Sequence, residues 1–337
     1  MRVSIALATY NGQRFLAEQL ESFRAQTAPP AELVVTDDGS TDRTLAILEE
    51  FASSAPFPVR VVRNEQRLGP SENFFKAASL CREPWIAFAD QDDVWLPRKL
   101  EVVARIQGMH PATLYVAHRA EIVDAALRPT GKLLQVPRFN RLRLVKPRRE
   151  RIWLPPLGFT ATFDGRLVRE MPVRDRPIET HDRWVFVLAS TLGVVAYVPD
   201  VLALYRRHDA NTSQFTERPP LNEELTDSRF EDQFRHQAET ITRIADYLER
   251  NSSSASICEP RDVREAAEMY RRQAKWLYGR ALLCSRTSPG SLRAGRVAAM
   301  ILGGAYTSHR RGGLGWRAGL KDLLRVGAAA LPSKAFR

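Results

Sequence analysis

Short apolar runs alternate with amphipathic segments through the N-terminal part of the chain. The runs at residues 3–8, 33–35, 59–62 and 85–89 have the length and composition of buried strands. Between them, apolar side chains recur at helical spacing, as they do from Phe15 to Phe23. Strands and helices that alternate in this way form βαβ units around a parallel sheet, so the alternation predicts an α/β fold.

Polar, turn-forming residues follow each of these strands. They are Thr9-Tyr10-Asn11, Asp37-Asp38-Gly39, Asn64 and Asp90-Gln91-Asp92. Turn chemistry alone explains any one of them, but the carboxyl ends of parallel strands meet at one edge of a sheet, where ligands bind. Together they favour a nucleotide site. No G-x-G-x-x-G follows the first strand and no glycine-rich lysine loop is present, so neither a Rossmann dinucleotide site nor a P-loop is indicated.

Three carboxylates crowd together directly after the fourth strand: Asp90, Asp92 and Asp93. Such a cluster repels itself, and hydrogen bonds or a nearby cation must compensate it. Two acids spaced i, i+2 at a strand end can direct their oxygens at one hard divalent ion that keeps waters and substrate phosphates. A solvated acidic turn is the alternative. The metal site is favoured because the cluster ends a strand rather than lying in a polar loop.

These motifs, taken in order, resemble a known enzyme family. They are Thr9-Tyr10-Asn11, Asp37-Asp38-Gly39-Ser40-Thr41-Asp42, residues 64–69 and Asp90-Gln91-Asp92-Asp93-Val94-Trp95-Leu96-Pro97. The set resembles family 2 inverting glycosyltransferases with the GT-A fold, over about residues 2–212. The Asp-Gln-Asp-Asp-Val-Trp form, with Gln19-Leu20-Glu21-Ser22, is most similar to bacterial rhamnosyltransferases of surface-polysaccharide assembly. The resemblance implies a GT-A nucleotide-sugar-binding domain with a mostly parallel sheet at 1–220, and a helical basic extension at 221–337.

The resemblance also implies roles on the donor side. The residues expected to bind the donor nucleotide are Thr9, Tyr10, Asn11, Asp38, Asp90 and Arg206. Asp90 and Asp92 form the Asp-x-Asp pair, and Mg²⁺ or Mn²⁺ on the diphosphate acts as a Lewis acid on the leaving group. A histidine at the place of His208 completes the metal or diphosphate site, although a lone histidine is usually a packed or solvated side chain. Arg206 and Arg207 are candidate diphosphate clamps, while Asp209 departs from the Gly-Asn pattern expected after the histidine.

On the acceptor side, the resemblance places the catalytic base at Asp182. An acid at a helix start is commonly only an N-cap. Inversion, however, requires a carboxylate that takes the proton from the acceptor hydroxyl as it attacks the anomeric carbon. Residues 157–163 resemble the acceptor-side strand of the family, so Gly158, Thr160 and Trp184 are expected on that side. A plain core strand explains residues 157–163 about as well.

The basic charge of the chain is concentrated in its tail. The net charge is +11, and from residue 286 onward ten Lys and Arg face one acid, Asp322, which makes +9. The tail is either a helical cap or a basic surface that lies on anionic lipid. No nucleic-acid partner is expected, because no aromatic-studded basic motif accompanies the charge. The basic run from Arg138 to Arg151 is predicted to be a solvated loop, with contact to an anionic acceptor as the alternative.

The cellular location follows from three further features. The chain enters a strand directly after Met1, so no signal peptide is expected. The most apolar later stretch, 297–305, is shorter than the ~20 residues that span a bilayer. Cys81, Cys258 and Cys284 lack metal-ligand spacing and fit a reducing compartment. The protein is therefore expected in the cytoplasm, with the inner face of the cell membrane as a possible site of peripheral contact.

The expected function is sugar transfer with inversion. The donor is a nucleotide-diphosphate-sugar, with rhamnose as one candidate sugar, and the acceptor is a glycan or lipid-linked molecule in cell-surface polysaccharide synthesis. One alternative is a non-catalytic nucleotide-sugar or glycan-binding module, against which the intact Asp90, Asp92 and Asp182 argue. Another is a nucleotidylyltransferase, which requires a glycine-rich basic loop after the first strand, and none is present.

Overall fold

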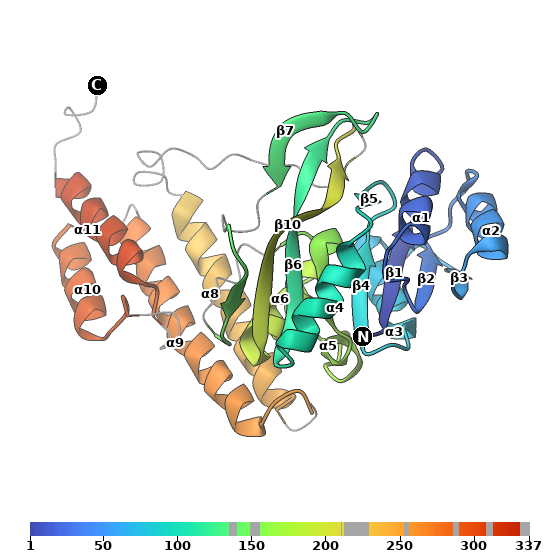
Figure 1. Ribbon diagram of the computed structural model, residues 1–337. Coiled ribbons are helices and arrows are strands. Elements are labelled where there is room, and N and C mark those ends of the chain that lie inside the picture. The colour runs from blue at the N-terminus through green and yellow to red at the C-terminus, as the bar shows by residue number, and fades with distance from the viewer. Residues whose placement is uncertain are drawn as a thin grey trace. The chain divides into compact units, whose positions relative to one another are not determined.

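The computed structural model describes residues 1–134, 140–148, 156–209, 211, 229–252, 256–285, 290–307 and 313–330 (Figure 1). The chain divides into two compact units. The first comprises Met1–Thr212 with Ser254–Cys258, and the second comprises Ser213–Ser253 with Glu259–Arg337. The basic run is not a loop throughout, because Arg143 lies in strand β8 (Arg143–Val145), which pairs with another strand of the sheet. Arg138, Arg149 and Arg151 lie outside the described residues.

A ten-stranded sheet organises the first unit, in the order β3-β2-β1-β4-β9-β6-β10-β5, with β7 on β6 and β8 on β10. The strands are β1 (Val3–Thr9), β2 (Glu32–Asp37), β3 (Val59–Arg63), β4 (Trp85–Ala89), β5 (Val94–Trp95), β6 (Thr113–Val123), β7 (Pro129–Leu134), β8 (Arg143–Val145), β9 (Ala161–Asp164) and β10 (Val194–Arg206). β3, β2, β1 and β4 are parallel neighbours, and β10 is parallel to β6. The predicted α/β fold and its first four strands are confirmed.

Helices connect these strands and pack on the sheet. They are α1 (Leu16–Arg24), α2 (Thr44–Ser54), α3 (Pro70–Leu80), α4 (Lys99–Met109), the short α5 (Arg166–Arg169) and α6 (His181–Leu192). The apolar spacing of α1 buries Leu16, Leu20 and Phe23 against the core. α3 packs on β1 and β2, and α6 packs on β6 and β10. The parallel order requires such crossovers, and it brings the ends of β1, β2 and β4 to one edge.

Two local expectations are corrected by the structure. The stretch at 157–163 is not one strand, because a 3₁₀ turn at Gly158–Thr160 precedes β9. β10 is longer than the run at 194–199 suggests and reaches Arg206. Irregular register around Val198 and Val201 lets the strand continue beyond Pro199, because a bulge accommodates a residue without a ladder donor. This continuation carries Arg206 to the edge where the polar loops converge.

The second unit is helical, as the sequence predicts. It contains α8 (Arg229–Arg250), α9 (Pro260–Cys284), α10 (Gly290–Leu302) and α11 (Trp316–Ala330), and α8 lies along α9. Arg280 of α9 donates from Nε to both carboxylate oxygens of Asp322 in α11 at 2.9 Å, and the Tyr306 hydroxyl donates to Asp322 at 3.0 Å. This buried ion pair fixes α11 against α9. Among the described residues, no helix is long and apolar enough to cross a membrane.

Candidate active site

Asp37 holds together the loops that follow β1 and β2. Its carboxylate is fully buried and accepts four hydrogen bonds: from the Gly39 and Ser40 amides, the Ser40 hydroxyl and the Thr9 hydroxyl. All of its usual acceptor positions are thereby filled. Asp37 therefore shapes the site, and the sequence analysis did not assign it that role. The hydroxyl of Thr9, expected on the donor side, is buried and committed to Asp37.

Asp38 fixes the next loop along the edge. It is 3% exposed, and its carboxylate accepts hydrogen bonds from the Asn64 side chain at 2.9 Å and from the Leu68 and Gly69 amides at 2.6 and 2.8 Å. A loop that a single carboxylate holds at three points is well ordered, because each charge-assisted bond is stronger than a neutral one. Asp38 thus builds one wall of a pocket at the carboxyl ends of β1 to β3.

That pocket has a volume of about 530 Å³. Its lining consists of Tyr10, Asp38, Gly39, Arg63, Asn64, Glu65, Gln66 and Arg67. The Arg67 guanidinium carbon lies 4.0 Å from the centre of the Tyr10 ring, which is 37% exposed. The pocket therefore offers the aromatic face of Tyr10, the cations of Arg63 and Arg67, the amides of Asn64 and Gln66, and space for a small planar ligand.

Gln91 joins the acidic loop to the first loop. Its side chain accepts from the Tyr10 amide and donates to the Tyr10 carbonyl, both at 3.0 Å. Gly12 lies so close that a Cβ atom there would stand 2.3 Å from the Gln91 side-chain oxygen. Asn11 adds a link to the second loop, since its side chain accepts from the Thr41 amide at 2.9 Å. Tyr10, Asn11 and the acidic loop consequently form one connected surface.

The acidic loop carries negative charge that the protein does not fully compensate. Burial, followed by the carboxylates of Asp92 and Asp182, raises the pKa of Asp90 to about 8. Burial and the same kind of repulsion raise the pKa of Asp93 well above its usual range, although its side chain accepts a bond from the Arg206 amide at 3.1 Å. A cation bound at this point would favour the ionised carboxylates.

Lys99 is the cation that lies beneath this loop, and the sequence analysis missed it. Its side chain is fully buried; Nζ donates to the Phe159 carbonyl at 2.6 Å and lies 3.3 Å from the centre of the Trp95 ring. Burial lowers its pKa well below the usual range, while Asp93 and Asp90 favour its charged form. Lys99 therefore ties the acidic loop to the turn at Gly158–Thr160. In the sequence, Lys99 looks like an ordinary solvent-facing lysine at the start of a helix, so nothing there indicated that it would be buried.

We expect Lys99→Met to lower the free energy of unfolding by about 3 kcal/mol, because it leaves the buried Phe159 carbonyl without its donor and removes the polar neighbour of Asp93 and Asp90. Urea unfolding measures the change, with Lys132→Met on the exposed strand β7 as the matched control. Equal stability of the two variants would show that Lys99 contributes nothing to the loop.

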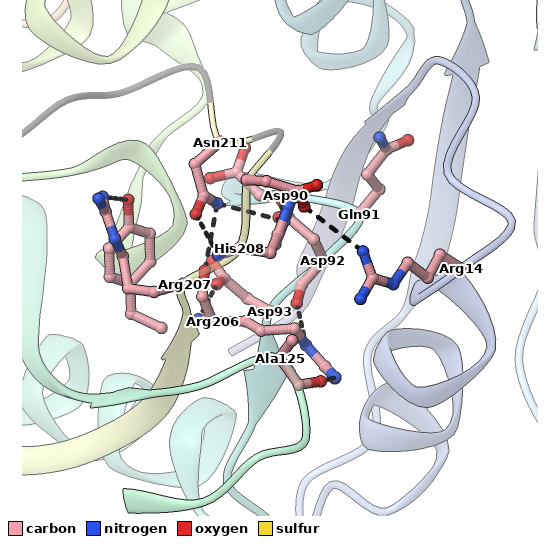
Figure 2. A network of polar contacts seen from close by, with 12 residues as sticks. Arg14, Asp90, Gln91, Asp92, Asp93, Ala125, Arg206, Arg207, His208 and Asn211 are labelled. Carbon is pink, nitrogen blue, oxygen red and sulfur yellow. Dashed lines mark hydrogen bonds and ion pairs between the residues drawn. The ribbon is translucent and has the colours of Figure 1, made fainter. Parts of the chain in front are cut away.

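Asp92 and His208 face each other across the edge of the sheet (Figure 2). His208 Nε2 lies 2.8 Å from Asp92 Oδ2, and the amide of His208 donates to the Asn211 side chain at 2.7 Å. Asp92 is 21% exposed and His208 is 7% exposed at their side chains. The segment after β10 thus brings the predicted histidine next to the predicted carboxylate, although 116 residues separate them in the chain.

The structure places Arg206 beneath these residues rather than on the site surface. Its buried guanidinium donates to the Asp92 carbonyl and the Ala125 carbonyl at 2.8 Å each (Figure 2). It pairs with Glu18 as well. It also lies over the Phe15 ring, which contacts the His208 ring. Since its donors are already engaged, Arg206 supports the acidic loop instead of presenting free donors to a diphosphate. Arg207 lies half-buried beside Tyr205.

Asp182 stands at the start of α6, close to the acidic loop. Its charge acts on Asp90, and the Asp182 side chain accepts from the Arg183 amide at 2.7 Å. The neighbouring His181 ring stacks on Phe74 at a centroid distance of 4.0 Å, and burial lowers the pKa of His181 to about 4. A Cβ atom at Gly158 would lie 3.0 Å from His181 Nε2, a tight contact that glycine avoids. His181 is therefore a neutral packing neighbour of Asp182.

The other two residues expected on the acceptor side are buried. Thr160 is fully buried and donates its hydroxyl to the Leu157 carbonyl at 2.8 Å. Trp184 is 1% exposed and belongs to the buried side of α6. Neither side chain is open to an acceptor in this structure. The difference arises because α6 is buried on all sides from Trp184 to Leu192, and only its first three residues are partly exposed.

The residues fit a divalent ion that is completed by substrate. In the part of the chain that the structure describes, no three His, Cys, Asp or Glu side chains form a ready metal cage. Mg²⁺ does not require one, because it binds one or two carboxylates together with substrate phosphates and water. The raised pKa of Asp90 and the partly exposed Asp92 give a carboxylate pair that a cation would stabilise. Asp90, Asp92 and His208 are the groups that would hold it.

Comparison with protein families decides the identity. The family model of glycosyl transferase family 2 matches residues 4–175, just over half of the 337 residues. The chain belongs to glycosyltransferase family 2. The match includes the loops after β1 and β2 and the acidic loop after β4, and it ends before Asp182. The predicted family is confirmed.

Several relatives extend the comparison. An uncharacterized glycosyltransferase of Nostoc is 25% identical over 284 residues, which cover 82% of this chain and 84% of that protein. The dTDP-rhamnosyl transferase RfbG of Shigella flexneri is 36% identical over 136 residues, 37% of this chain and 47% of that protein. A Mycobacterium tuberculosis protein is 27% identical over 221 residues, and the match spans only 59% of its length.

Solved structures agree with the GT-A fold. Residues 1–349 of TarS from S. aureus, solved in complex with UDP-GlcNAc, superpose with a TM-score of 0.54 at 18% identity, covering 95% of this chain and 92% of that chain. At this identity the likeness concerns the fold alone. The predicted GT-A fold of this glycosyltransferase is confirmed.

Proposed function

We propose that this family 2 glycosyltransferase transfers a sugar, with inversion, from a nucleotide-diphosphate-sugar to a glycan or lipid-linked acceptor. The observation that carries the proposal is the meeting of Asp90, Asp92 and Asp182 at one edge of the sheet, where the charges of Asp92 and Asp182 act on Asp90. A donor pocket opens at the same edge, beyond Tyr10 and Asp38. This transfer needs carboxylates that hold a metal, a carboxylate that accepts the proton of the acceptor hydroxyl, and a pocket for the nucleoside.

In the proposed complex, the base and ribose of the donor occupy the pocket beside Tyr10. Its ring offers a stacking face, and Arg67 can close over a base as it now lies over the ring. Thr9 and Asn11 act through the backbone that they order, and Asp38 acts through the loop that it holds. The diphosphate then extends toward the acidic loop, which Gln91 connects to Tyr10.

We propose Mg²⁺ or Mn²⁺ as the cofactor, held by Asp90, Asp92 and His208. When bound, the ion would neutralise the diphosphate and stabilise it as a leaving group. The protein orients the ligands: Arg206 holds the Asp92 backbone, and Phe15 packs against His208. The side-chain oxygen of Asn211 fixes the His208 backbone by accepting a hydrogen bond from the His208 amide.

Asp182 is the proposed catalytic base. It accepts the proton of the acceptor hydroxyl while that oxygen forms a bond to the anomeric carbon. The bond between that carbon and the diphosphate oxygen breaks on the opposite side, and the nucleoside diphosphate leaves with the electron pair. One displacement inverts the configuration, as the family resemblance implies. Gly158 permits the close approach of the turn to Asp182.

The sugar is proposed to be rhamnose, on the similarity of one segment to the Shigella flexneri dTDP-rhamnosyl transferase. A screen tests the function as a whole: the purified chain is incubated with dTDP-rhamnose, UDP-GlcNAc and other nucleotide-sugars, with Mg²⁺ or Mn²⁺, and release of nucleoside diphosphate is measured. We expect metal-dependent hydrolysis of one donor. Tight binding of a donor without hydrolysis or transfer would instead support a nucleotide-sugar-binding module. The proposed location is the cytoplasmic face of the cell membrane.

Arg67→Ala is expected to raise the KM for the donor about tenfold with little change in kcat, because it removes a cation from the nucleoside pocket but touches no reacting atom. Steady-state kinetics with the donor found in the screen measure both constants. Arg82→Ala, at an exposed arginine outside the pocket, is the control. A fall in kcat at constant KM would place Arg67 at the chemistry instead of the base.

A further inference from the structure

The two arginines of α10 point to the body of the second unit and not outward. Arg293 donates to the Ser285 carbonyl at 2.6 Å, and Arg296 donates to the Leu282 carbonyl at 3.3 Å. These carbonyls end α9, where the helix dipole favours positive charge. Val297 and Met300 are buried on the same side. The basic residues of α10 therefore attach the helix to α9.

The opposite face of α10 is exposed and carries no charge. Its exposed residues are Ser291, Leu292, Ala294, Gly295, Ala298, Ala299, Ile301 and Leu302. Leu302 is 89% exposed, Leu292 is 54% exposed and Ile301 is 51% exposed. A surface helix normally turns charged or polar residues to solvent and apolar residues to the core. The solvent side of α10 instead carries apolar residues and no charge, which is unfavourable in water.

α11 has a second exposed apolar stripe. Trp316, Leu320 and Leu323 are 68%, 52% and 52% exposed and lie at i, i+4 and i+7 of one face. Arg317 is exposed and Lys321 half-exposed at its side. The other face is anchored, because Gly319 closes on the Tyr306 ring and Asp322 pairs with Arg280. The stripe is thus held outward by contacts on the opposite side of the helix.

Backbone hydrogen bonds join the residues that follow α10 to the residues that precede α11. The Leu314 amide donates to the Ala305 carbonyl at 2.7 Å, and the Gly315 amide donates to the Thr307 carbonyl at 3.0 Å. These bonds tie the start of α11 to the residues that follow α10. Leu302 and Trp316 accordingly lie beside these bonded residues, near each other.

We propose that the exposed faces of α10 and α11 dock on an anionic lipid surface. Leucine and isoleucine suit the acyl boundary, tryptophan suits the interface, and basic residues attract acidic headgroups. Arg317 and Lys321 are the described basic residues beside the apolar stripe, and the one acid from residue 286 onward, Asp322, is buried against Arg280, so no exposed acid of this segment opposes the attraction. A second copy of the chain is a poorer occupant, since a symmetric pairing of this surface would bring the Arg317 and Lys321 cations of both copies to one interface. Docking does not depend on catalysis and goes beyond the proposed function.

Vesicle flotation of the full chain tests this proposal. The vesicles contain equal amounts of phosphatidylglycerol and phosphatidylcholine, or phosphatidylcholine alone. We expect the chain to float with the anionic vesicles, less so as salt screens the charges, and not with the neutral ones. Leu302→Glu and Leu320→Glu should each weaken binding about tenfold or more, because each removes a leucine from the apolar contact. Met109→Glu, at an equally exposed apolar residue of α4 in the first unit, should bind like the unaltered chain.

Thermal unfolding and donor hydrolysis without vesicles accompany each variant, so that a folding defect or an inactive enzyme is separated from lost docking. Three results would overturn the proposal. In the first, the unaltered chain does not float with anionic vesicles at low salt. In the second, the leucine variants float as well as Met109→Glu does. In the third, the chain forms a dimer that the leucine variants disrupt, without any binding to vesicles, and the face is then an interface between copies.

Discussion

Asp182→Asn is expected to reduce sugar transfer by roughly 10²–10⁴-fold while donor affinity stays unchanged. Asparagine keeps the size of the side chain but cannot accept a proton from the acceptor hydroxyl. The residue lies at the start of α6 and does not line the pocket proposed for the donor nucleoside, so we expect donor affinity to be kept. Transfer rates with saturating donor, together with calorimetric titration of the donor nucleotide, measure the two effects separately.

Glu179→Gln is the matched control for this variant, because Glu179 is an exposed acid three residues earlier in the chain. It should transfer sugar at the normal rate. If Asp182→Asn loses donor affinity and keeps its transfer rate, Asp182 belongs to the donor site and another group is the base. Equal losses in both variants would indicate a general effect of charge near α6.

Asp92→Asn is expected to lower activity by about 10²–10³-fold and to remove the metal dependence of nucleotide binding. The substitution preserves shape, and its amide can still bond to His208, so the fold should persist. Its effect comes from the lost negative charge, which Mg²⁺ or Mn²⁺ requires at this partly exposed position. Titration of nucleoside diphosphate with and without EDTA measures the metal-dependent part directly.

Asp209→Asn provides the control, since Asp209 is an 88% exposed acid near the same loop that pairs only loosely with Arg14 at 3.5 Å. It should remain close to normal in activity and metal response. Unchanged turnover of the unaltered enzyme in EDTA would falsify the metal role. A loss of folding in Asp92→Asn, seen by thermal unfolding, would show that the Asp92–His208 contact is structural.

The local patterns were sufficient to predict the architecture. Strands at 3–8 and 85–89 could be recognised because a buried parallel strand is a short apolar run, and the helix after Phe15 because its buried face repeats at helical spacing. The order of the polar loops then identified the family, since each loop follows its own strand. Positions Asp90, Asp92, Asp182 and His208 were predicted as site residues on this basis, and their roles remain predictions for the experiments above.

The supports of the site were decided by tertiary structure alone. Arg206 resembles a surface arginine in the sequence, yet the length of β10 places it under Asp92, and Lys99 is buried because α4 begins against the turn that contains Phe159. Trp184 is buried because α6 is enclosed on all sides after its first turn, and Arg293 turns inward to the carbonyls that end α9. Local sequence determines the periodicity and turns of each segment. Which charged side chain is buried depends on strand length, helix rotation and long-range partners, and these are set only when the segments pack together.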